Sequence, residues 1–359
     1  ALEQQGVPRP YLALLATLYS DQTGSVGDGR RFRILRGVKQ GDVISPLLFN
    51  AGLEVAIRRW KTKLGQHGLL LDGAERLTNI RYADDLVLYA RSWQELCEMI
   101  EMLVVELSGV GLSLNTAKTK LFTSALLESP LYIDVAGDMV ATLSGTAVHK
   151  CLGRHIPGNL RCRGDIEFAH RLAAAWGKFH KHRDRLLNRS VSIKLRLKLF
   201  QAVVTPTVLF GLTTLPMTKA KITQLDATQR RMLRSIAGWV RYAEDDWADT
   251  MRRVNAKLER AMAEFPVAPW SEQFANRQFS LAERLARDTA AWPARAARWE
   301  PPVVLDGWLH CGRSQGRPRR KWDDFLKAFS NNIFHAEWHE IASQEWLATR
   351  QDFINFVTM

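Results

Sequence analysis

A pair of aspartates between two strand-forming runs constrains the fold of this chain more than any other feature. Residues 81–86 read Arg-Tyr-Ala-Asp-Asp-Leu, and the flanking residues 77–80 and 86–89 alternate or run apolar. Such runs favour β-strands, and an Asp-Asp pair suits the tight turn between them. The sequence therefore predicts a β-hairpin with Asp84 and Asp85 at its tip. Two adjacent carboxylates there can bind Mg2+, because this hard cation prefers oxygen ligands.

An isolated Asp-Asp pair is more often an ordinary turn, and the chain contains an internal comparison. Residues 242–246 read Tyr-Ala-Glu-Asp-Asp, are followed by Trp247 and have no apolar strand on either side. We interpret this second string as a solvated loop or the start of a helix. The two pairs are expected to differ because their neighbours differ.

Two further blocks give the first pair its significance. Residues 36–42 read Arg-Gly-Val-Lys-Gln-Gly-Asp, with Ser-Pro-Leu-Leu-Phe at 45–49, and residues 111–115 read Gly-Leu-Ser-Leu-Asn, followed by Lys118. In this order, the blocks resemble the palm of a reverse transcriptase of the non-LTR (LINE-type) retrotransposon family. The resemblance covers about residues 1–240. A later string at 316–322 resembles one common after such polymerase domains and implies no chemistry.

The resemblance implies an RNA-directed DNA polymerase that extends a primer 3′-hydroxyl. Its partners would be an RNA template, a DNA primer and deoxynucleoside triphosphates, and its cofactor would be Mg2+, with two ions in the intact family site. By resemblance, Asp84 and Asp85 are catalytic and metal-binding, and Asp84 is the stronger ligand. Lys118 matches a lysine that protonates or neutralises pyrophosphate in related polymerases. A solvated lysine is the alternative for Lys118.

The same resemblance assigns nucleotide and template contacts to the glycine-rich block and to the hairpin. Glycine permits close backbone approach to a ligand, and the alternative is a simple turn before a capped helix. Tyr82 matches the residue beneath the primer terminus, although a strand tyrosine that packs into the core needs no such role. The implied contact residues are Arg36, Gly37, Lys39, Gln40, Gly41 and Tyr82.

The family's first palm carboxylate has no counterpart here. It lies on a strand upstream of a segment that resembles residues 1–19, and Asp21, Asp28 and Asp42 do not match it. We therefore expect a 5′-truncated chain that lacks this aspartate and most of the fingers, with impaired polymerisation because metal positioning carries most of such catalysis. The alternative is a catalytically inactive nucleic-acid-binding remnant.

The order of patterns predicts an α+β polymerase palm, an antiparallel sheet with helices on one face, followed by an all-α thumb and a helical C-terminal region. We place partial fingers and palm at 1–156, the thumb at 157–240 and a helical region of unknown role at 241–359. Within the palm, Ser45 and Pro46 suit an N-cap and the first helical position, and Ser92 with Glu95 forms a capping box.

The positive charge of the chain is concentrated in its middle. Residues 151–239 hold 17 Lys and Arg against 4 Asp and Glu, whereas the flanking regions are balanced. A polyanion is the natural partner for such a segment, although a solvated bundle face would also account for the charge. The candidate nucleic-acid contacts are Arg171, Lys178, Lys181, Arg185, Lys194 and Lys198.

The remaining patterns set weaker expectations. Four cysteines without a CxxC pair indicate a reducing, intracellular location, with nucleus or cytoplasm left open. Residues 199–218 carry no charge, but their Gln, Thr and Pro content favours a buried helix ending near Gly211 over a membrane span. We expect no membrane partner and see no clear protein partner. A zinc site is a minor alternative, with the ligands His310, Cys311, His335 and His339.

Overall fold

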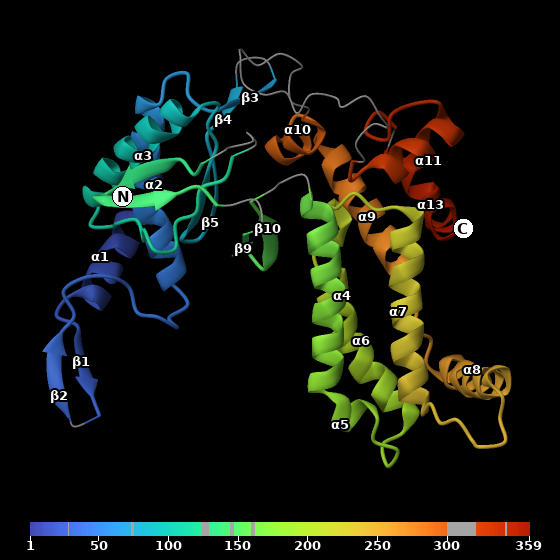
Figure 1. Ribbon diagram of the computed structural model, residues 1–359. Coiled ribbons are helices and arrows are strands. Elements are labelled where there is room, and N and C mark those ends of the chain that lie inside the picture. The colour runs from blue at the N-terminus through green and yellow to red at the C-terminus, as the bar shows by residue number, and fades with distance from the viewer. Residues whose placement is uncertain are drawn as a thin grey trace. The chain divides into compact units, whose positions relative to one another are not determined.

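The computed structural model describes residues 1–27, 29–72, 75–123, 129–143, 147–158, 162–299, 321–341 and 343–359. Its internal contacts divide the chain into two compact units, drawn in Figure 1. The first comprises most of residues 1–142 and the second most of residues 143–359.

The first unit combines helices with short antiparallel hairpins. Each described strand pairs only within its own hairpin, so the expected antiparallel sheet takes the form of separate two-stranded sheets. The elements are η1 (Glu3–Gln5), α1 (Arg9–Tyr19), β1 (Thr23–Val26), β2 (Arg30–Arg33), α2 (Ser45–Lys63), β3 (Leu69–Asp72), β4 (Glu75–Leu77), β5 (Asn79–Tyr82), β6 (Asp85–Leu88), α3 (Trp93–Ser108), β7 (Tyr132–Val135) and β8 (Asp138–Ala141).

Helices α2 and α3 form the centre of this unit. They pack through a buried cluster that includes Trp60 and Met99, and the Trp60 Nε1 donates a hydrogen bond of 2.9 Å to the Met99 carbonyl. Leu86 and Leu88 of β6 pack against the same cluster, and Ile133 of β7 packs beside α3. The helices thus hold the β5–β6 hairpin by its apolar face, while its tip remains outside the core.

The start of α2 differs by one residue from the sequence expectation. Ile44 occupies the N-cap and Ser45 is the first helical residue, so Pro46 lies at the second position. The Ser45 hydroxyl is buried and lies 3.5 Å from the Tyr19 hydroxyl instead of capping a backbone amide. Ser45 is therefore used to join α1 to α2. The local pattern resembled a cap because proline is tolerated throughout the first turn.

The predicted start of α3 is confirmed, with one change of partner. The Ser92 hydroxyl accepts a hydrogen bond of 3.1 Å from the Glu95 amide, as an N-cap does. The buried Glu95 carboxylate does not return to Ser92; it accepts hydrogen bonds from Arg91 and from the Gly68 amide. The hydrogen bond between the Glu95 side chain and Ser92 that would complete a capping box is therefore absent. The Glu95 carboxylate instead links α3 to the segment that precedes β3.

Where the structure describes it, the second unit is a helical assembly with one hairpin. Its elements are β9 (Val148–Cys151), β10 (Arg154–Pro157), α4 (Arg163–Lys181), α5 (Arg183–Leu186), α6 (Ile193–Leu209), η3 (Leu212–Thr214), α7 (Lys219–Ala237), α8 (Trp247–Glu264), α9 (Trp270–Arg287), α10 (Trp292–Arg298), α11 (Asp324–Phe334), α12 (Ser343–Ala348) and α13 (Arg350–Thr358).

One hydrophobic core runs through this unit from Phe168 to Val357. Trp270 of α9 stacks on Phe200 of α6, and its Nε1 donates a hydrogen bond of 3.0 Å to the Thr205 hydroxyl. The core is therefore continuous across residue 240, where we drew a boundary between thumb and C-terminal region. The β9–β10 hairpin, which we placed in the palm, also packs on α4, and α4 lies beyond the expected palm limit at 156. The three domain ranges stay predictions.

Helix α6 is the buried helix expected before Gly211. It ends at Leu209, and Gly211 takes a left-handed conformation with φ of 69°. Residues 193–214 are long and apolar enough to cross a membrane by length and composition alone. Seven α6 side chains, among them Leu197, Phe200 and Val208, are buried within the unit. Burial in the core thus accounts for the apolar character of this helix.

Candidate functional site

The β5–β6 hairpin presents the first aspartate pair at its tip. Tyr82 pairs with Asp85 across the strands, so Ala83 and Asp84 form a two-residue turn. Ala83 has a φ of 52°, in the left-handed region that L-residues rarely adopt. Strain of this kind costs about 1–2 kcal/mol and persists where the surroundings over-determine the backbone. The predicted hairpin is confirmed, and its turn is held in one particular conformation.

An ion pair fixes this hairpin to α2. Arg81 lies opposite Leu86 and donates a hydrogen bond to the Glu54 carboxylate, which also accepts one of 2.6 Å from Arg58. Partial burial raises the pKa of Glu54, but the hydrogen bonds from Arg58 and Arg81 outweigh it and leave the pKa below its ordinary value. Glu54 therefore stays ionised at neutral pH and anchors the strand three residues before Asp84.

Asp84 and Asp85 are exposed, and neither side chain has a hydrogen bond or ion pair with any described residue. Adjacent, unpaired carboxylates suit a hard divalent cation, because their oxygen lone pairs are not used elsewhere. Among the described residues, no three His, Cys, Asp or Glu side chains gather at one point. The hairpin thus supplies two carboxylates of a cation site, and the described part of the chain brings no third beside them.

Tyr82 is 68% exposed, so it is not the core tyrosine that we considered as an alternative. Its ring lies at the end of β5, opposite Asp85 in the strand register. An exposed ring beside two carboxylates offers a flat apolar surface at the same place as a cation site. The surface position is compatible with a contact to a substrate, which itself stays a prediction.

The glycine-rich block forms an exposed loop between β2 and α2. Gly37 and Gly41 have φ values of 88° and 94°, which explains why glycine stands at both positions. The side chains of Arg36, Lys39 and Gln40 make no hydrogen bond or ion pair with described residues. Glu54 lies on α2 nine residues after its start, about 14 Å along the helix. The loop and the hairpin are thus connected through one rigid element.

Lys118 lies in a turn after the third block. The Lys118 amide donates hydrogen bonds of 3.1 Å to both the side-chain oxygen and the backbone carbonyl of Asn115, so Asn115 shapes this turn. Leu112 and Leu114 pack on the cluster that also receives Leu86. Lys118 is exposed and its amine has no described partner. The core therefore brings the third block and the hairpin to the same pair of helices, with the Lys118 amine free in solvent.

The second aspartate pair has a different fate. Asp246 is the N-cap of α8 and accepts a hydrogen bond of 2.6 Å from the Asp249 amide, while Asp245 forms an ion pair of 2.6 Å with Arg253. The hydrogen bond from the Asp249 amide holds the pKa of Asp246 below its ordinary value. The interpretation of this string as a helix start is confirmed. Both carboxylates are engaged locally.

One predicted nucleic-acid contact, Arg171, is a structural residue. It is 6% exposed, its guanidinium forms an ion pair of 2.6 Å with the buried Glu167, and it also donates to the Gly153 carbonyl. Glu167 accepts a further hydrogen bond of 2.7 Å from the His155 amide. Arg171 therefore fastens the β9–β10 hairpin to α4. The sequence placed it in a basic stripe but did not reveal its buried partner.

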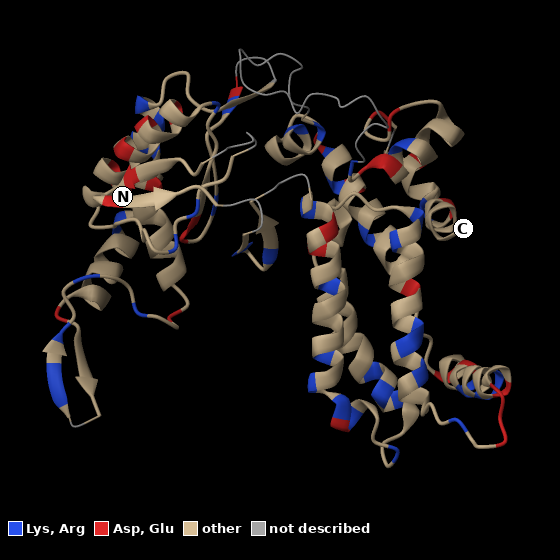
Figure 2. Ribbon diagram, in the orientation of Figure 1, with Lys and Arg blue, Asp and Glu red and all other residues tan. Residues whose placement is uncertain are grey.

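The other five predicted contacts, Lys178, Lys181, Arg185, Lys194 and Lys198, are exposed. They lie where α4 ends, at α5 and where α6 begins. Further cations from α7, α8 and the α5–α6 turn join them, as Figure 2 shows at the bottom of the view. We call this surface the basic end and define it by Lys178, Lys181, Arg185, Arg189, Lys194, Lys198, Arg230, Arg231 and Lys257.

Local helix electrostatics account for only part of the basic end. Lys178 and Lys181 in the last turn of α4 complement the negative end of that helix dipole. Lys194 lies in the first turn of α6, where the dipole disfavours a cation, and that turn carries no acidic residue. Lys194, Lys181 and Arg185 have no described hydrogen bond or ion pair. The surface thus retains its positive charge and suits a polyanion.

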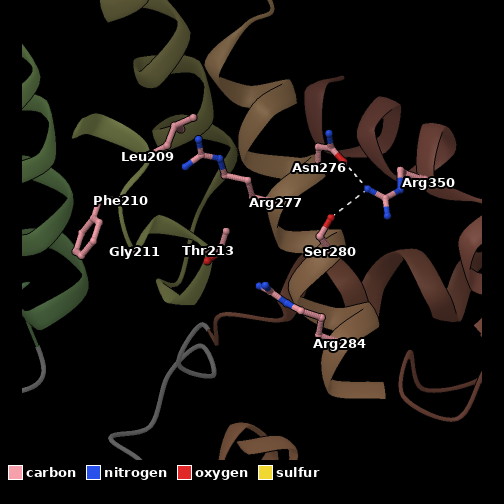
Figure 3. Close-up of a pocket in the computed structure, with 9 residues that line it drawn as sticks. All are labelled: Leu209, Phe210, Gly211, Thr213, Asn276, Arg277, Ser280, Arg284 and Arg350. Carbon is pink, nitrogen blue, oxygen red and sulfur yellow. Dashed lines mark hydrogen bonds between the residues drawn. The ribbon is translucent and has the colours of Figure 1, made fainter. Parts of the chain in front are cut away.

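Sequence reasoning missed a hollow lined by arginines, drawn in Figure 3. Arg277 and Arg284 of α9 and Arg350 of α13 lie around it, together with residues of the turn after α6. The seven-residue spacing of Arg277 and Arg284 places both on one helix face and was the available signal. Arginines on a concave surface are candidates for binding an anion.

The zinc alternative finds no support in the described residues. No group of three metal-ligating side chains is present among them. His335 ends α11 in a left-handed conformation, and burial lowers the pKa of His339. His310 and Cys311 lie outside the described residues, as do residues 316–320. Cys97 and Cys162 carry free thiols.

Comparison with known proteins relates the first part of the chain to a family. Residues 1–156 match the model described as reverse transcriptase (RNA-dependent DNA polymerase). A transposon-derived protein of Caenorhabditis elegans, described as uncharacterized, is 27% identical over 280 residues, which are 76% of this chain and 94% of that protein.

Two relatives are retrovirus-related Pol polyproteins of R2 retrotransposable elements. That of the type-1 element of Nasonia vitripennis is 38% identical over 90 residues, 25% of this chain and 8% of the polyprotein. That of a type-2 element of Drosophila melanogaster is 34% identical over 122 residues, 33% of this chain and 11% of the polyprotein. The chain thus matches only about a tenth of these polyproteins. Over residues 1–156, it carries a reverse transcriptase domain of the non-LTR retrotransposon family.

Proposed function

We propose that this chain extends a DNA primer on an RNA template, with Asp84 and Asp85 as its metal-binding residues. The observation that carries the proposal is the pair of exposed carboxylates without a described partner, on a strained turn that Arg81 and Glu54 fasten to α2. A carboxylate that is free of protein partners and fixed in position is what a catalytic cation requires.

Reverse transcriptases use divalent metals such as Mg2+, and Asp84 and Asp85 offer the hard oxygen donors that this ion takes. When bound, a divalent cation supplies a Lewis acid that activates the primer hydroxyl and neutralises phosphate charge. Asp84 occupies the turn itself and Asp85 begins β6. We assign the stronger metal contact to Asp84, because its side chain leaves the hairpin at the tip.

The neighbouring blocks complete the proposed substrate site. Tyr82 supports the primer terminus with its exposed ring. Arg36 and Lys39 bind phosphate groups, and Gly37, Gln40 and Gly41 contact the nucleotide and template through an open backbone. Lys118, whose amine has no described partner, neutralises or protonates the leaving pyrophosphate. Each of these roles uses a group that the fold leaves unpaired.

The basic end contributes nucleic-acid binding that does not depend on base sequence. Its cations bind phosphate oxygens of a template–primer duplex, and such contacts weaken as salt rises because they release counterions. The support for this assignment is the exposed charge of Lys178, Lys181, Arg185 and Lys194, which no described acid neutralises.

A second function, nucleic-acid binding without turnover, is favoured by one specific observation. The described residues gather no third carboxylate beside Asp84 and Asp85. An incomplete cation site would leave the basic end able to bind nucleic acid while nucleotidyl transfer is impaired by several orders of magnitude. The two functions therefore predict the same binding and different catalysis.

The deciding experiment measures incorporation of deoxynucleotides on a primed RNA template, with and without Mg2+. The chain is compared with Asp84→Ala/Asp85→Ala and with the matched variant Asp245→Ala/Asp246→Ala, which removes the second pair. Polymerase function predicts incorporation that is abolished in the first variant and kept in the matched one. The thermal midpoint of each variant is measured beside it.

Absence of incorporation by the chain, with duplex binding intact, would select the binding function instead. Incorporation that survives the removal of both Asp84 and Asp85 would contradict the proposed site. If both double variants are inactive and their thermal midpoints have fallen, the loss of activity reflects unfolding. The thermal midpoints thus separate this outcome from the others.

A further inference from the structure

The second unit contains a hollow of about 440 Å3 at the end of α6 opposite the basic end. It is lined by the turn that follows α6, by one face of α9 and by α13. Its residues are Leu209, Phe210, Gly211, Thr213, Asn276, Arg277, Ser280, Arg284 and Arg350, drawn in Figure 3. Ligand pockets commonly enclose about 300–1,000 Å3. The hollow therefore has room for a ligand of nucleotide size.

The charge of this hollow is positive and only partly neutralised. Arg350 donates hydrogen bonds to the Asn276 side chain at 2.7 Å and the Ser280 hydroxyl at 3.0 Å, and forms an ion pair of 3.1 Å with Glu283. Arg277 and Arg284 are exposed and have no hydrogen bond or ion pair with described residues. No acidic residue is among the described residues that line the hollow. Two guanidinium groups thus remain available.

These two arginines line the same side of the hollow. Both extend from α9 toward the turn after α6, as Figure 3 shows. Ser280 lies between them in the sequence of α9, and Thr213 of the turn lines the same hollow. Guanidinium groups and hydroxyls are donors that match the oxygens of a phosphate. Arginines kept for solubility would have no reason to share a concave surface with hydroxyl donors.

The apolar side of the hollow indicates what accompanies the phosphate. Phe210 is 47% exposed, although it follows directly on the buried end of α6. The Arg171 guanidinium lies 4.8 Å from the centre of its ring, which fixes the ring in place. A fixed, half-exposed aromatic ring near free arginines is the combination by which proteins bind single strands, stacking a base and pairing the backbone phosphate.

We propose that this hollow binds a single-stranded segment of nucleic acid, with backbone phosphates held by Arg277 and by Arg284 and a base lying against Phe210. The identity of the ligand rests on the proposed function, since a nucleic-acid partner is what makes a phosphodiester the relevant anion. The hollow itself contains none of the residues assigned to catalysis or to the basic end.

The test measures binding of a fluorescently labelled uridine 12-mer by anisotropy over a range of salt concentrations. In Arg277→Ala/Arg284→Ala, the dissociation constant rises about tenfold or more, and the slope of log K against log salt falls by about 0.7 for each phosphate that is no longer neutralised. The matched control, Arg252→Ala/Arg260→Ala on α8, removes the same charge from exposed positions and leaves binding unchanged. Phe210→Leu, which keeps apolar bulk, weakens binding without altering the salt slope.

Four outcomes would overturn the proposal. They are unchanged binding in the Arg277/Arg284 variant, an equal weakening in the α8 control, an equal weakening for a blunt RNA–DNA duplex, and displacement of the 12-mer by pyrophosphate with no effect of Phe210→Leu. The last would indicate a site for small phosphates. Because Asp84→Ala/Asp85→Ala should bind the 12-mer normally, this inference and the proposed polymerase function can fail separately.

Discussion

The chain contains two Asp-Asp pairs, and the fold treats them in opposite ways. Asp245 forms an ion pair with Arg253, and Asp246 accepts a hydrogen bond from the backbone at the start of α8. Asp84 and Asp85 stand at a hairpin tip with no described partner. A carboxylate's availability, and not its presence in a motif, therefore distinguishes a candidate site from a structural element.

The arginines of the second unit repeat this contrast. Arg171 is buried against Glu167 and holds the β9–β10 hairpin, whereas Arg277 and Arg284 face a hollow and have no described partner. A charge that the protein has already neutralised contributes to stability, and one that it leaves unpaired is available to a ligand. Substitutions in both kinds of group test this division.

Single substitutions within the first pair should separate the two aspartates. Asp84→Asn lowers Mg2+-dependent nucleotide incorporation by about 10^3-fold, the scale for removal of a positioned electrostatic group, and Asp85→Asn lowers it less. The measurement is the single-turnover rate at saturating Mg2+. Equal reductions in the two variants would contradict the assignment of Asp84 as the stronger ligand.

Removal of Arg171 should cost stability. Arg171→Ala destabilises the second unit by about 3 kcal/mol, because the buried Glu167 carboxylate loses its partner. Arg185→Ala, at an exposed position on α5, changes it by less than about 0.5 kcal/mol. Urea unfolding followed by tryptophan fluorescence measures both. Similar values for the two variants would show that Arg171 is not a structural residue.

Removal of cations from the basic end should weaken binding and hardly affect stability. Lys178→Ala/Lys181→Ala/Lys194→Ala weakens binding to an RNA–DNA duplex and reduces the salt slope by up to about 2.7, at about 0.9 for each neutralised phosphate. Thermal stability should hardly change, because none of these side chains has a described partner. Filter binding at several salt concentrations gives the slope. An unchanged slope would mean that the cations serve only for solvation.

The smallest effect concerns pH and the second pair. Since the folded pKa of Asp246 is lowered, its contribution to stability is present above the unfolded value of about 3.9 and is lost as pH falls through the lower folded pKa. Asp246→Asn should therefore lower the thermal midpoint at pH 7, and the difference should shrink as pH falls below the unfolded value. Asp84→Asn should leave the midpoint unchanged at pH 7. A pH-independent difference for Asp246→Asn would contradict a contribution from the Asp246 charge.

Much of the local structure could be predicted from the sequence, because its causes are local. The hairpin at 79–88, the Ser92 cap and the helix start at Asp246 follow from turn residues, capping chemistry and apolar runs. The burial of α6 was predicted because its Gln, Thr and Pro content disfavours a membrane span. These features depend on neighbours within a few positions, which a sequence displays.

The rest depended on contacts between distant residues. Ser45 was expected as a cap, but a tyrosine 26 positions away takes its hydroxyl. Arg171 was predicted to lie in a charged stripe. Residue spacing shows which face of a helix a side chain occupies, but it does not show that a hairpin covers that face. The hollow combines residues from three helical segments, so no single stretch of sequence contains it. The same limit hid the continuity of the core across residue 240.

That continuity makes the basic end dependent on α13. Phe353 and Val357 of α13 are buried in the same core as Phe200 and Leu197 of α6, and Lys219 of α7 donates a hydrogen bond of 2.8 Å to the Phe356 carbonyl. A frameshift or stop codon just before Arg350 would expose the face of α9 against which α13 packs and would remove these side chains from the core that α6 shares. A copy of the gene damaged there would thus cease to bind nucleic acid through unfolding, with every cation of the basic end still encoded.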